Sequence, residues 1–327
     1  MLESWKILEI MSNSKIYNIA IIGAGKMALE YVKVIKNFQN LKIIGIVSRG
    51  DRNKKKLKIK YSDIEFYKNI SDLYKYCHID ATIVAVSQDS TFKVAKMLVK
   101  FRSIKLFEKP FGLNYLEFKK LKKIYSNHNK STFIAFNRRE YSSVKYLQNL
   151  LRGNNGRRII TISDQENINF LKSSGKAKKI YSNWMYCNSI HLIDLINIFA
   201  RGKLIKMTKS IPWKSTSRNF VSAAFHFSSS DIVIYNALWN RPGPWAINVS
   251  TKNEFFELKP LESLSMKKIT SRTFKKFSIS KKDQDYKPGL YLLVNELYKL
   301  LRGRSSKLVN IEEYEKSVKY LKYIYDV

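Results

Sequence analysis

The chain has 327 residues, of which 45% are hydrophobic, which is enough for two domains that each bury a core. Its 60 lysines and arginines outnumber its 26 aspartates and glutamates, giving a net charge of +34. The two distant cysteines, Cys77 and Cys187, exclude a disulfide framework, and no apolar run approaches the roughly 18 residues of a membrane helix. We therefore expect a cytoplasmic protein.

The positive charge has two interpretations. It can attract nucleic acid or an anionic membrane. Alternatively, lysine is simply spread along the chain together with abundant Ile, Asn and Tyr, as AT-rich coding produces. Basic clusters are short, such as 54–56, and no groove-reading motif is present, so we expect no specific nucleic-acid binding and no membrane insertion. The positive field would still attract a phosphorylated cofactor or a nucleotide-sugar.

Residues 1–15 read as a short N-terminal extension. An apolar run, 17–22, then predicts a strand, and a Gly-x-Gly-x-x-Ala stretch followed by a helical pattern comes directly after it. Small residues permit a tight turn, close approach to a pyrophosphate and close helix–strand packing. The alternative is a plain strand–helix turn. The motif predicts a dinucleotide contact through Gly23, Gly25, Lys26, Met27 and Ala28.

The next predicted strand, 41–47, bears on the choice of cofactor. An NAD site would normally place an acid at this strand end to hold the ribose 2′-hydroxyl. Here the first polar residues are Ser48 and Arg49, which suit a 2′-phosphate. Asp51 is the counter-argument, since a small shift in register would make it the ribose ligand, and Arg49 could also be a solvated loop charge. We expect NADP in preference to NAD.

Strands and helices continue to alternate along the chain. This spacing predicts a doubly wound parallel sheet, and so a dinucleotide-binding domain over residues 16–137. Ser87, at the end of the fourth strand, is a further candidate cofactor contact. The predicted strands are 64–67, 80–86, 104–107 and 132–136, and the helices are 70–76, about 91–101 and 114–125.

Two charged stretches follow strands of this domain. Glu108 and Lys109, with a proline after them, come directly after strand 104–107, at the kind of position where open α/β sheets bind ligands. Arg138 and Arg139, preceded by Asn137, close the last strand and suit phosphate or carboxylate recognition. The alternative for the arginines is a solvated pair at the start of a helix.

The second domain, for substrate binding and oligomerisation, is expected over residues 138–327, with the alternative that its C-terminal helices pack back on the first domain. Its pattern predicts a mainly antiparallel sheet with helices on one face, so the whole chain is of the α/β class. The lysine-rich segment 266–282 is expected to be a loop. Strands are predicted at 158–163, 205–211, 220–227, 231–238, 245–251 and 254–258, and helices at 183–199, 289–301 and 311–325.

The predicted helix 183–199 contains further candidate site residues. At α-helical spacing, His191 shares a face with Asn188 and with Cys187. Histidine titrates in a range suited to proton transfer, although an isolated helix histidine is more often structural. No metal site is expected.

Together these residues resemble the Gfo/Idh/MocA family of NAD(P)-dependent oxidoreductases. The likeness rests on the glycine motif at Gly23, on Glu108-Lys109-Pro110, and on a helix with His191 and Asp194. It implies a Rossmann domain, a second domain with an open sheet, a nicotinamide near Lys109, and dimers or tetramers. It also implies that Lys109 polarises the substrate oxygen, that Glu108 holds this lysine and contacts the cofactor region, and that His191 is the acid/base.

A branch associated with surface-polysaccharide sugar metabolism is similar in three further stretches, 137–139, 188–191 and 286–289. Two departures from the family pattern stand out: Cys187 occupies a position that is aspartate in many members, and Ser87 and Thr91 replace a proline and a histidine. Asn188 can hydrogen-bond a substrate but cannot act as a base. The leading hypothesis is an oxidoreductase acting on the CH–OH group of a sugar or nucleotide-sugar. The alternative is a non-catalytic NAD(P)-binding regulator with the same fold.

Overall fold

The computed structural model describes residues 15–213 and 219–327, so the expected N-terminal extension lies outside it apart from Lys15. The described chain forms two compact units. The first contains the described residues through Gly112, then Leu116–Phe136 and Leu290–Ile311. The second contains Leu113–Tyr115, Asn137–Gly289 and Glu312–Val327.

The first unit is built on a sheet with the order β15-β6-β5-β4-β1-β2-β3. Strands β1 to β6 are parallel in the order 3-2-1-4-5-6, and β15 runs antiparallel to β6. This is the strand order of a Rossmann domain, so the predicted doubly wound sheet is confirmed. The strands are β1 Tyr17–Ile22, β2 Leu41–Val47, β3 Phe66–Tyr67, β4 Ala81–Val84, β5 Ile104–Glu108, β6 Thr132–Ala135 and β15 Val309–Asn310.

Helices pack against this sheet because its strands are apolar on both faces. All residues of β4 and β6 are buried, as expected for parallel strands covered on two sides. Helix α13 packs on α2, where Phe38 just beyond α2 stacks on Tyr291 with ring centroids 4.9 Å apart. The helices are α2 Lys26–Ile35, α3 Asp51–Lys60, α4 Ile70–Tyr76, α5 Thr91–Leu98, α6 Tyr115–Ile124 and α13 Leu290–Leu301.

A buried lysine in β5 makes the stability of this unit depend on pH. The Lys105 side chain donates to the carbonyls of Phe101 and Ser103, at 2.7 and 3.1 Å, and burial lowers its pKa to about 8. The unfolded chain, with a lysine pKa of about 10.4, binds more protons above pH 8 than the folded one. Stability therefore rises with pH in this window, and the burial penalty is fully present below it.

We expect the wild type to gain about 2 kcal/mol of unfolding free energy over a Lys105→Met variant between about pH 7 and pH 9.5. Urea unfolding of both proteins at several pH values measures this difference. A difference that does not change with pH would contradict the assignment.

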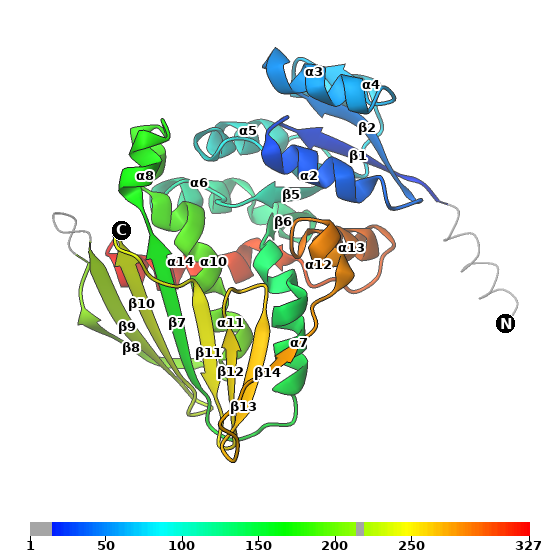
Figure 1. Cartoon of the computed structure of the whole chain (residues 1–327). Helices are drawn as coiled ribbons and strands as arrows, with labels where there is room; N and C mark the ends of the chain where they lie inside the picture. Colours follow the sequence, from blue (N-terminus) through cyan, green and yellow to red (C-terminus); the bar gives the residue numbers. More distant parts are fainter. Residues whose placement is uncertain (1–14, 214–218) are drawn as a thin grey trace, which may run out of the picture. The chain divides into compact units, whose positions relative to one another are not determined.

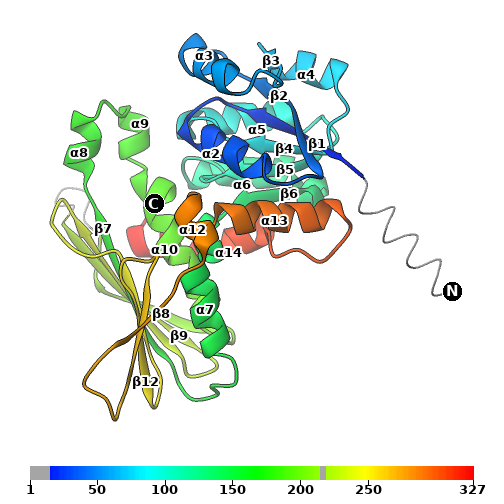
Figure 2. The ribbon, with the colours of Figure 1, turned by 45° about the vertical axis from the view of Figure 1, so that its right-hand side comes forward.

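The second unit is built on a sheet with the order β14-β13-β12-β11-β7-β10-β9-β8. Its neighbouring strands are antiparallel except for β10 beside β7. Figures 1 and 2 show α7, α10 and α14 on one face of this sheet. The strands are β7 Ile159–Glu166, β8 Leu204–Ile211, β9 Phe220–Phe227, β10 Ile232–Trp239, β11 Ala246–Ser250, β12 Glu254–Leu258, β13 Leu264–Lys268 and β14 Lys275–Phe277.

Strand β10 shows why one face of this sheet is covered and the other is not. Burial alternates along it: Val233, Tyr235, Ala237 and Trp239 are fully buried, whereas the residues between them are partly exposed. Alternation with period two is the pattern of a sheet with a single packed face. The expected mainly antiparallel sheet is therefore confirmed.

The expectation of a loop over 266–282 was wrong. The segment contains the end of β13, all of β14 and the start of α12, Lys281–Asp285. Strands β13 and β14 lie at one edge of the sheet, where lysine side chains commonly prevent pairing with other chains. The high lysine content therefore made these strands look like a loop in the sequence. The other helices are α7 Ser142–Leu150, α8 Ile168–Ser173, α9 Lys178–Tyr181, α10 Ile190–Asp194, α11 Ile196–Phe199 and α14 Ile311–Tyr325.

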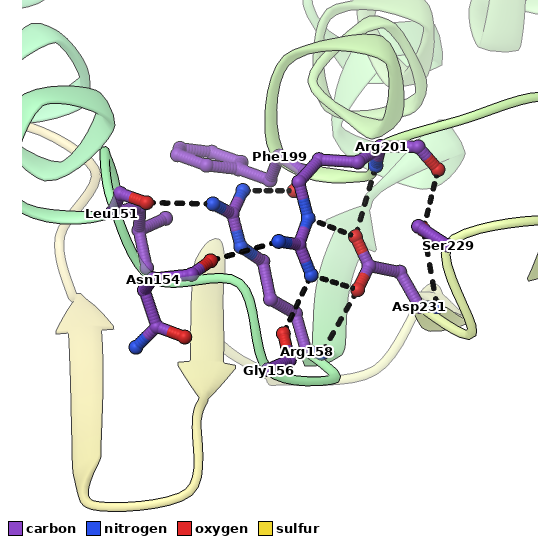
Figure 3. Close-up of polar contacts among 8 residues, drawn as sticks. All are labelled: Leu151, Asn154, Gly156, Arg158, Phe199, Arg201, Ser229 and Asp231. Carbon is purple, nitrogen blue, oxygen red and sulfur yellow. Dashed lines mark hydrogen bonds and ion pairs between the residues drawn. The ribbon is translucent and has the colours of Figure 1, made fainter.

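Two arginines near the start of β7 illustrate how this unit satisfies structural arginines (Figure 3). Arg158 donates to the carbonyls of Leu151 and Phe199, at 2.7 and 3.0 Å. Arg201 forms a two-point ion pair with Asp231, at 3.0 and 2.7 Å. Burial alone would raise the pKa of Asp231, but hydrogen bonds from Arg201 and from backbone amides outweigh it and lower the pKa. Arg158 thus directs both Nη groups to carbonyls, while its buried Nε has no acceptor, and Arg201 directs its Nε and Nη groups to acceptors within the fold.

Candidate functional site

The glycine-rich loop follows β1 at the point where the strand order reverses. Gly23 has a φ of +108°, and a Cβ there would lie 2.4 Å from the carbonyl oxygen of Ala85, just after β4. Its N–H donates to the carbonyl of Val47, the last residue of β2, at 2.9 Å. Only glycine fits this turn, which joins the ends of three neighbouring strands.

The residues after Gly23 leave room for a ligand. A Cβ on Gly25 would meet nothing within 4 Å, and Gly25 is the N-cap of the ten-residue helix α2. Lys26 and Met27 begin this helix, and Ala28 is fully buried against the fold. Free space beside a helix N-terminus at a switch point is what the pyrophosphate of a dinucleotide requires, so these residues fit NAD or NADP.

The remaining candidate cofactor contacts lie at neighbouring strand ends. Ser48 follows β2, and its hydroxyl donates to the carbonyl of Gly50 at 2.9 Å. Arg49 beside it is exposed. Ser87 lies just beyond β4, and its hydroxyl donates to that of Ser90 at 2.9 Å. The structure thus brings the glycine loop, Ser48 and Ser87 to the same edge of the sheet, while the contact of Arg49 with a 2′-phosphate stays a prediction.

Glu108 ends β5 and Lys109 follows it, and both are partly buried. The hydroxyl of Tyr31, on the fully buried face of α2, donates to Glu108 Oε1 at 2.7 Å. Burial raises the pKa of Tyr31, and the charge of Glu108 raises it further, so the phenol stays a donor. The helix that starts at the glycine loop therefore fixes the carboxylate next to Lys109. Sequence reasoning missed Tyr31, since nothing local pairs it with a residue 77 positions away.

His191 belongs to the second unit, where it lies buried in α10. The turn before it, Met185–Ser189, is π-helical, with the N–H of Ile190 bonded to the carbonyl of Met185. The shared faces predicted for His191 assumed α-helical spacing, which this turn does not have. Cys187 is buried in an apolar cluster with Leu113 and Ile180.

A carboxylate that sequence reasoning missed holds Asn188. Glu166, the last residue of β7 and 4% exposed, accepts hydrogen bonds from Asn188 Nδ2 at 2.8 Å and from Trp184 Nε1 at 2.6 Å. The Ser189 hydroxyl also points to it at 3.4 Å. Because the amide nitrogen is engaged, Asn188 can offer its Oδ1 as an acceptor to a hydroxyl. Its position at the end of a strand was the one feature of the sequence that could have identified Glu166 as a candidate site residue.

Arg139 holds several elements of the second unit together. It forms a two-point ion pair with Asp194 of α10, at 2.6 and 2.7 Å, and the Ser317 hydroxyl of α14 donates to the same carboxylate at 2.7 Å. Burial lowers the pKa of Arg139, but the charge of Asp194 outweighs this and the pKa is raised. Arg139 therefore anchors the helix that carries His191.

Asn137 and Arg138 share the short 3₁₀ turn Asn137–Glu140 with Arg139. Asn137 Nδ2 donates to the carbonyl of Pro288 at 3.1 Å. The Arg138 guanidinium lies over the ring of Trp245, 4.5 Å from its centroid, and Trp245 Nε1 donates to the carbonyl of Gln165 at 2.8 Å. Among the candidate residues, Lys109 thus belongs to the first unit, and Arg138, Asn188 and His191 belong to the second.

Known folds resemble the whole described chain. A dehydrogenase from Chromobacterium violaceum is 15% identical, over 95% of this chain and 94% of that chain, with a TM-score of 0.81. An oxidoreductase from Agrobacterium radiobacter, solved with NAD⁺, L-tartaric acid and magnesium, is 13% identical over 95% of each chain, with a TM-score of 0.75. At these identities the likeness shows the fold.

A UDP-N-acetylglucosamine 3-dehydrogenase from Acidithiobacillus ferrooxidans is 12% identical, over 94% of this chain and 96% of that chain, with a TM-score of 0.73. No curated protein matches the sequence.

In the part of the chain that the structure describes, no helix has the length and apolar character to cross a membrane, and no group of three acidic, histidine or cysteine side chains is placed to hold a metal ion.

Residues 17–136 match the model of a family described as "Oxidoreductase family, NAD-binding Rossmann fold", GFO_IDH_MocA. The matched segment begins at β1 and ends just after β6, so it spans the six parallel strands with the glycine loop and Lys109. This segment is therefore similar to the NAD-binding Rossmann domain of the Gfo/Idh/MocA family of oxidoreductases.

Proposed function

We propose that the protein transfers a hydride between a nicotinamide cofactor and a carbinol or carbonyl carbon of a sugar or nucleotide-sugar. The observation that carries this proposal is the glycine loop at the switch point of the first unit, with Lys109 at the end of a strand two positions away in the same sheet. The neighbour named as a UDP-N-acetylglucosamine 3-dehydrogenase has the same fold and supports the sugar assignment. A role in surface-polysaccharide synthesis, in the cytoplasm, is part of the proposal.

The protein's own residues handle the substrate oxygen and its proton. A bound nicotinamide supplies the hydride acceptor or donor. Oxidation of a carbinol also releases a proton from the hydroxyl, which needs a nearby acceptor. We assign Lys109 to polarise this oxygen and His191 to accept or return the proton. Asn188, with its amide held by Glu166, accepts a hydrogen bond from a neighbouring hydroxyl.

The proposal is tested by incubating the protein with NADP⁺ or NAD⁺ and a panel of sugars and nucleotide-sugars. Absorbance of the reduced nicotinamide reports turnover, and calorimetry reports cofactor binding. A regulator on the same fold would bind the cofactor without any absorbance change for every sugar, and that result would refute the enzymatic proposal.

The cofactor preference is tested in the same assay. The first residues after β2 are Ser48 and Arg49 and not an acid, which favours a 2′-phosphate. We therefore expect a lower KM for NADP⁺ than for NAD⁺. The reverse order would contradict the preference for NADP.

We also propose self-association to a dimer or tetramer, because one face of the second unit's sheet is partly exposed. This face carries Ile232, Ile234 and Leu238 of β10 and the exposed Ile159 of β7. Apolar side chains in a row on a sheet favour a partner surface. Light scattering should give the mass of a dimer or a tetramer of the 38.3 kDa chain, and a purely monomeric protein at micromolar concentration would contradict this.

A further inference from the structure

Arg138 differs from its neighbours in the turn Asn137–Glu140 in how its charge is used. Arg139 pairs with Asp194, and Glu140 accepts from Lys145 at 2.7 Å. The guanidinium of Arg138 donates no hydrogen bond to any residue that the structure describes, and its Nε is buried. A buried guanidinium that donates no hydrogen bond at all carries a desolvation cost, so such a group calls for an explanation.

The structural arginines of the same unit provide the comparison. Arg158 shares a buried Nε without an acceptor, but it directs both Nη groups to carbonyls, and Arg201 directs its Nε and Nη groups to Asp231 and to carbonyls (Figure 3). Arg138 is held instead through its face, by the ring of Trp245 at 4.5 Å, and Trp245 is itself fixed by its bond to the Gln165 carbonyl. Stacking of this kind leaves the in-plane edge of the guanidinium available.

The backbone beneath Arg138 is held firmly. Asn137 is bonded to the carbonyl of Pro288, and a Cβ on Gly289, where φ is +72°, would lie 2.0 Å from the Asn137 carbonyl oxygen. With Arg139 fixed by its ion pair on the other side, the turn presents Arg138 from a rigid base. A preorganised guanidinium loses little entropy when it binds a planar partner.

The surroundings of Arg138 limit what it can bind. Burial lowers its pKa, while the charges of Glu262 and Glu166 raise it in part. Glu166 already accepts from Asn188 and Trp184. A ligand must therefore be held by direct hydrogen bonds to the guanidinium edge, because the surrounding carboxylates weaken any long-range attraction for an anion.

We infer that Arg138, stacked on Trp245, is the receptor for an oxyanion of the substrate, a carboxylate or a phosphate, and that Arg139 is a structural residue. This inference rests on the proposed function for the identity of the ligand as a substrate. It divides two adjacent arginines that the sequence does not distinguish. It also defines the substrate class as a sugar that carries an anionic group, directly or through a nucleotide.

The first test uses simple anions. Calorimetric titration of phosphate or malonate into the wild type, with saturating NADP⁺ to occupy the glycine loop and chloride as the ionic-strength blank, should show binding of at least one anion. Arg138→Met should weaken it at least tenfold, and Arg138→Lys should fall between them. Arg152→Met, which removes an exposed arginine at the end of α7, should behave as the wild type.

Circular dichroism of each variant shows whether it is folded, and Arg138→Lys keeps the test valid if the methionine variant is not. The inference is overturned if the wild type and a folded Arg138 variant bind both anions equally. It is also overturned if neither anion binds the wild type better than chloride does.

The second test identifies the source of the oxyanion. Glucose 6-phosphate, glucuronate and glucose are compared as ligands of the wild type and of Arg138→Met, again with NADP⁺. We expect one anionic sugar to bind the wild type at least tenfold more tightly than glucose, and the variant to lose this preference. Equal losses for all three sugars would mean that Arg138 acts only through structure.

The two proposals fail separately. Loss of anion discrimination in Arg138→Met, with no turnover of any sugar by the wild type, would support the inference and contradict the enzymatic function. Turnover of a neutral sugar at equal rates by the wild type and Arg138→Met would support the function and overturn the inference.

Discussion

Replacing Asp194 by alanine is expected to lower the free energy of unfolding of the second unit by about 3–5 kcal/mol. The carboxylate is 1% exposed and accepts from Arg139 at two points and from Ser317. Its removal leaves the Arg139 charge buried without its partner, and that uncompensated charge is the main cost. Urea unfolding followed by circular dichroism measures the change.

Glu315→Ala provides the matched control, because it removes the same charge from a more exposed pair. Glu315 and Lys319 lie 3.5 Å apart at i, i+4 on α14, and Lys319 is 63% exposed. An exposed helical pair contributes only about 0.3–0.5 kcal/mol. If Asp194→Ala costs no more than Glu315→Ala, the ion pair does not stabilise the unit and the structural role assigned to Arg139 is wrong.

Replacing Lys109 by alanine is expected to lower kcat by about 100- to 10,000-fold with little change in the Kd for the cofactor. The lysine ammonium is the group assigned to polarise the substrate oxygen, and the glycine loop proposed to hold the pyrophosphate does not depend on it. Stopped-flow absorbance of the nicotinamide measures kcat, and calorimetry measures cofactor binding.

The matched control is Lys123→Ala, an exposed lysine on α6 that removes the same charge from the first unit. It should leave both quantities unchanged. Wild-type turnover by Lys109→Ala would refute the role given to Lys109, and equal losses in both variants would indicate a general effect of net charge.

Features encoded by neighbouring residues were predictable from the sequence. The glycine loop, the parallel strands and Glu108-Lys109 follow from local pattern, and the structure places the loop where the pattern implied. Side-chain pairs between distant residues were not predictable. The Tyr31–Glu108 bond joins positions 77 residues apart, and the Arg139–Asp194 pair joins positions 55 apart. No periodicity in the chain encodes either pair.

The helix of His191 shows a subtler limit. The sequence predicts a continuous helix over 183–199, and the segment is largely helical, but Met185–Ser189 forms a π turn. Asn188 and Ser189 in this turn both point to Glu166, at the end of a strand 22 residues earlier in the chain. The π turn coincides with this tertiary contact, and no propensity within the helix would reveal it.

The pairing of β15 with β6 has a consequence for synthesis on the ribosome. Strand β6 ends at Ala135, but its partner Val309–Asn310 emerges only after more than half of the chain has followed it. Until then the nascent Rossmann sheet exposes an apolar edge, Thr132–Ala135, with unpaired backbone groups that another chain could bind. Nascent chains stalled before residue 309 should therefore need chaperones more than those stalled after it.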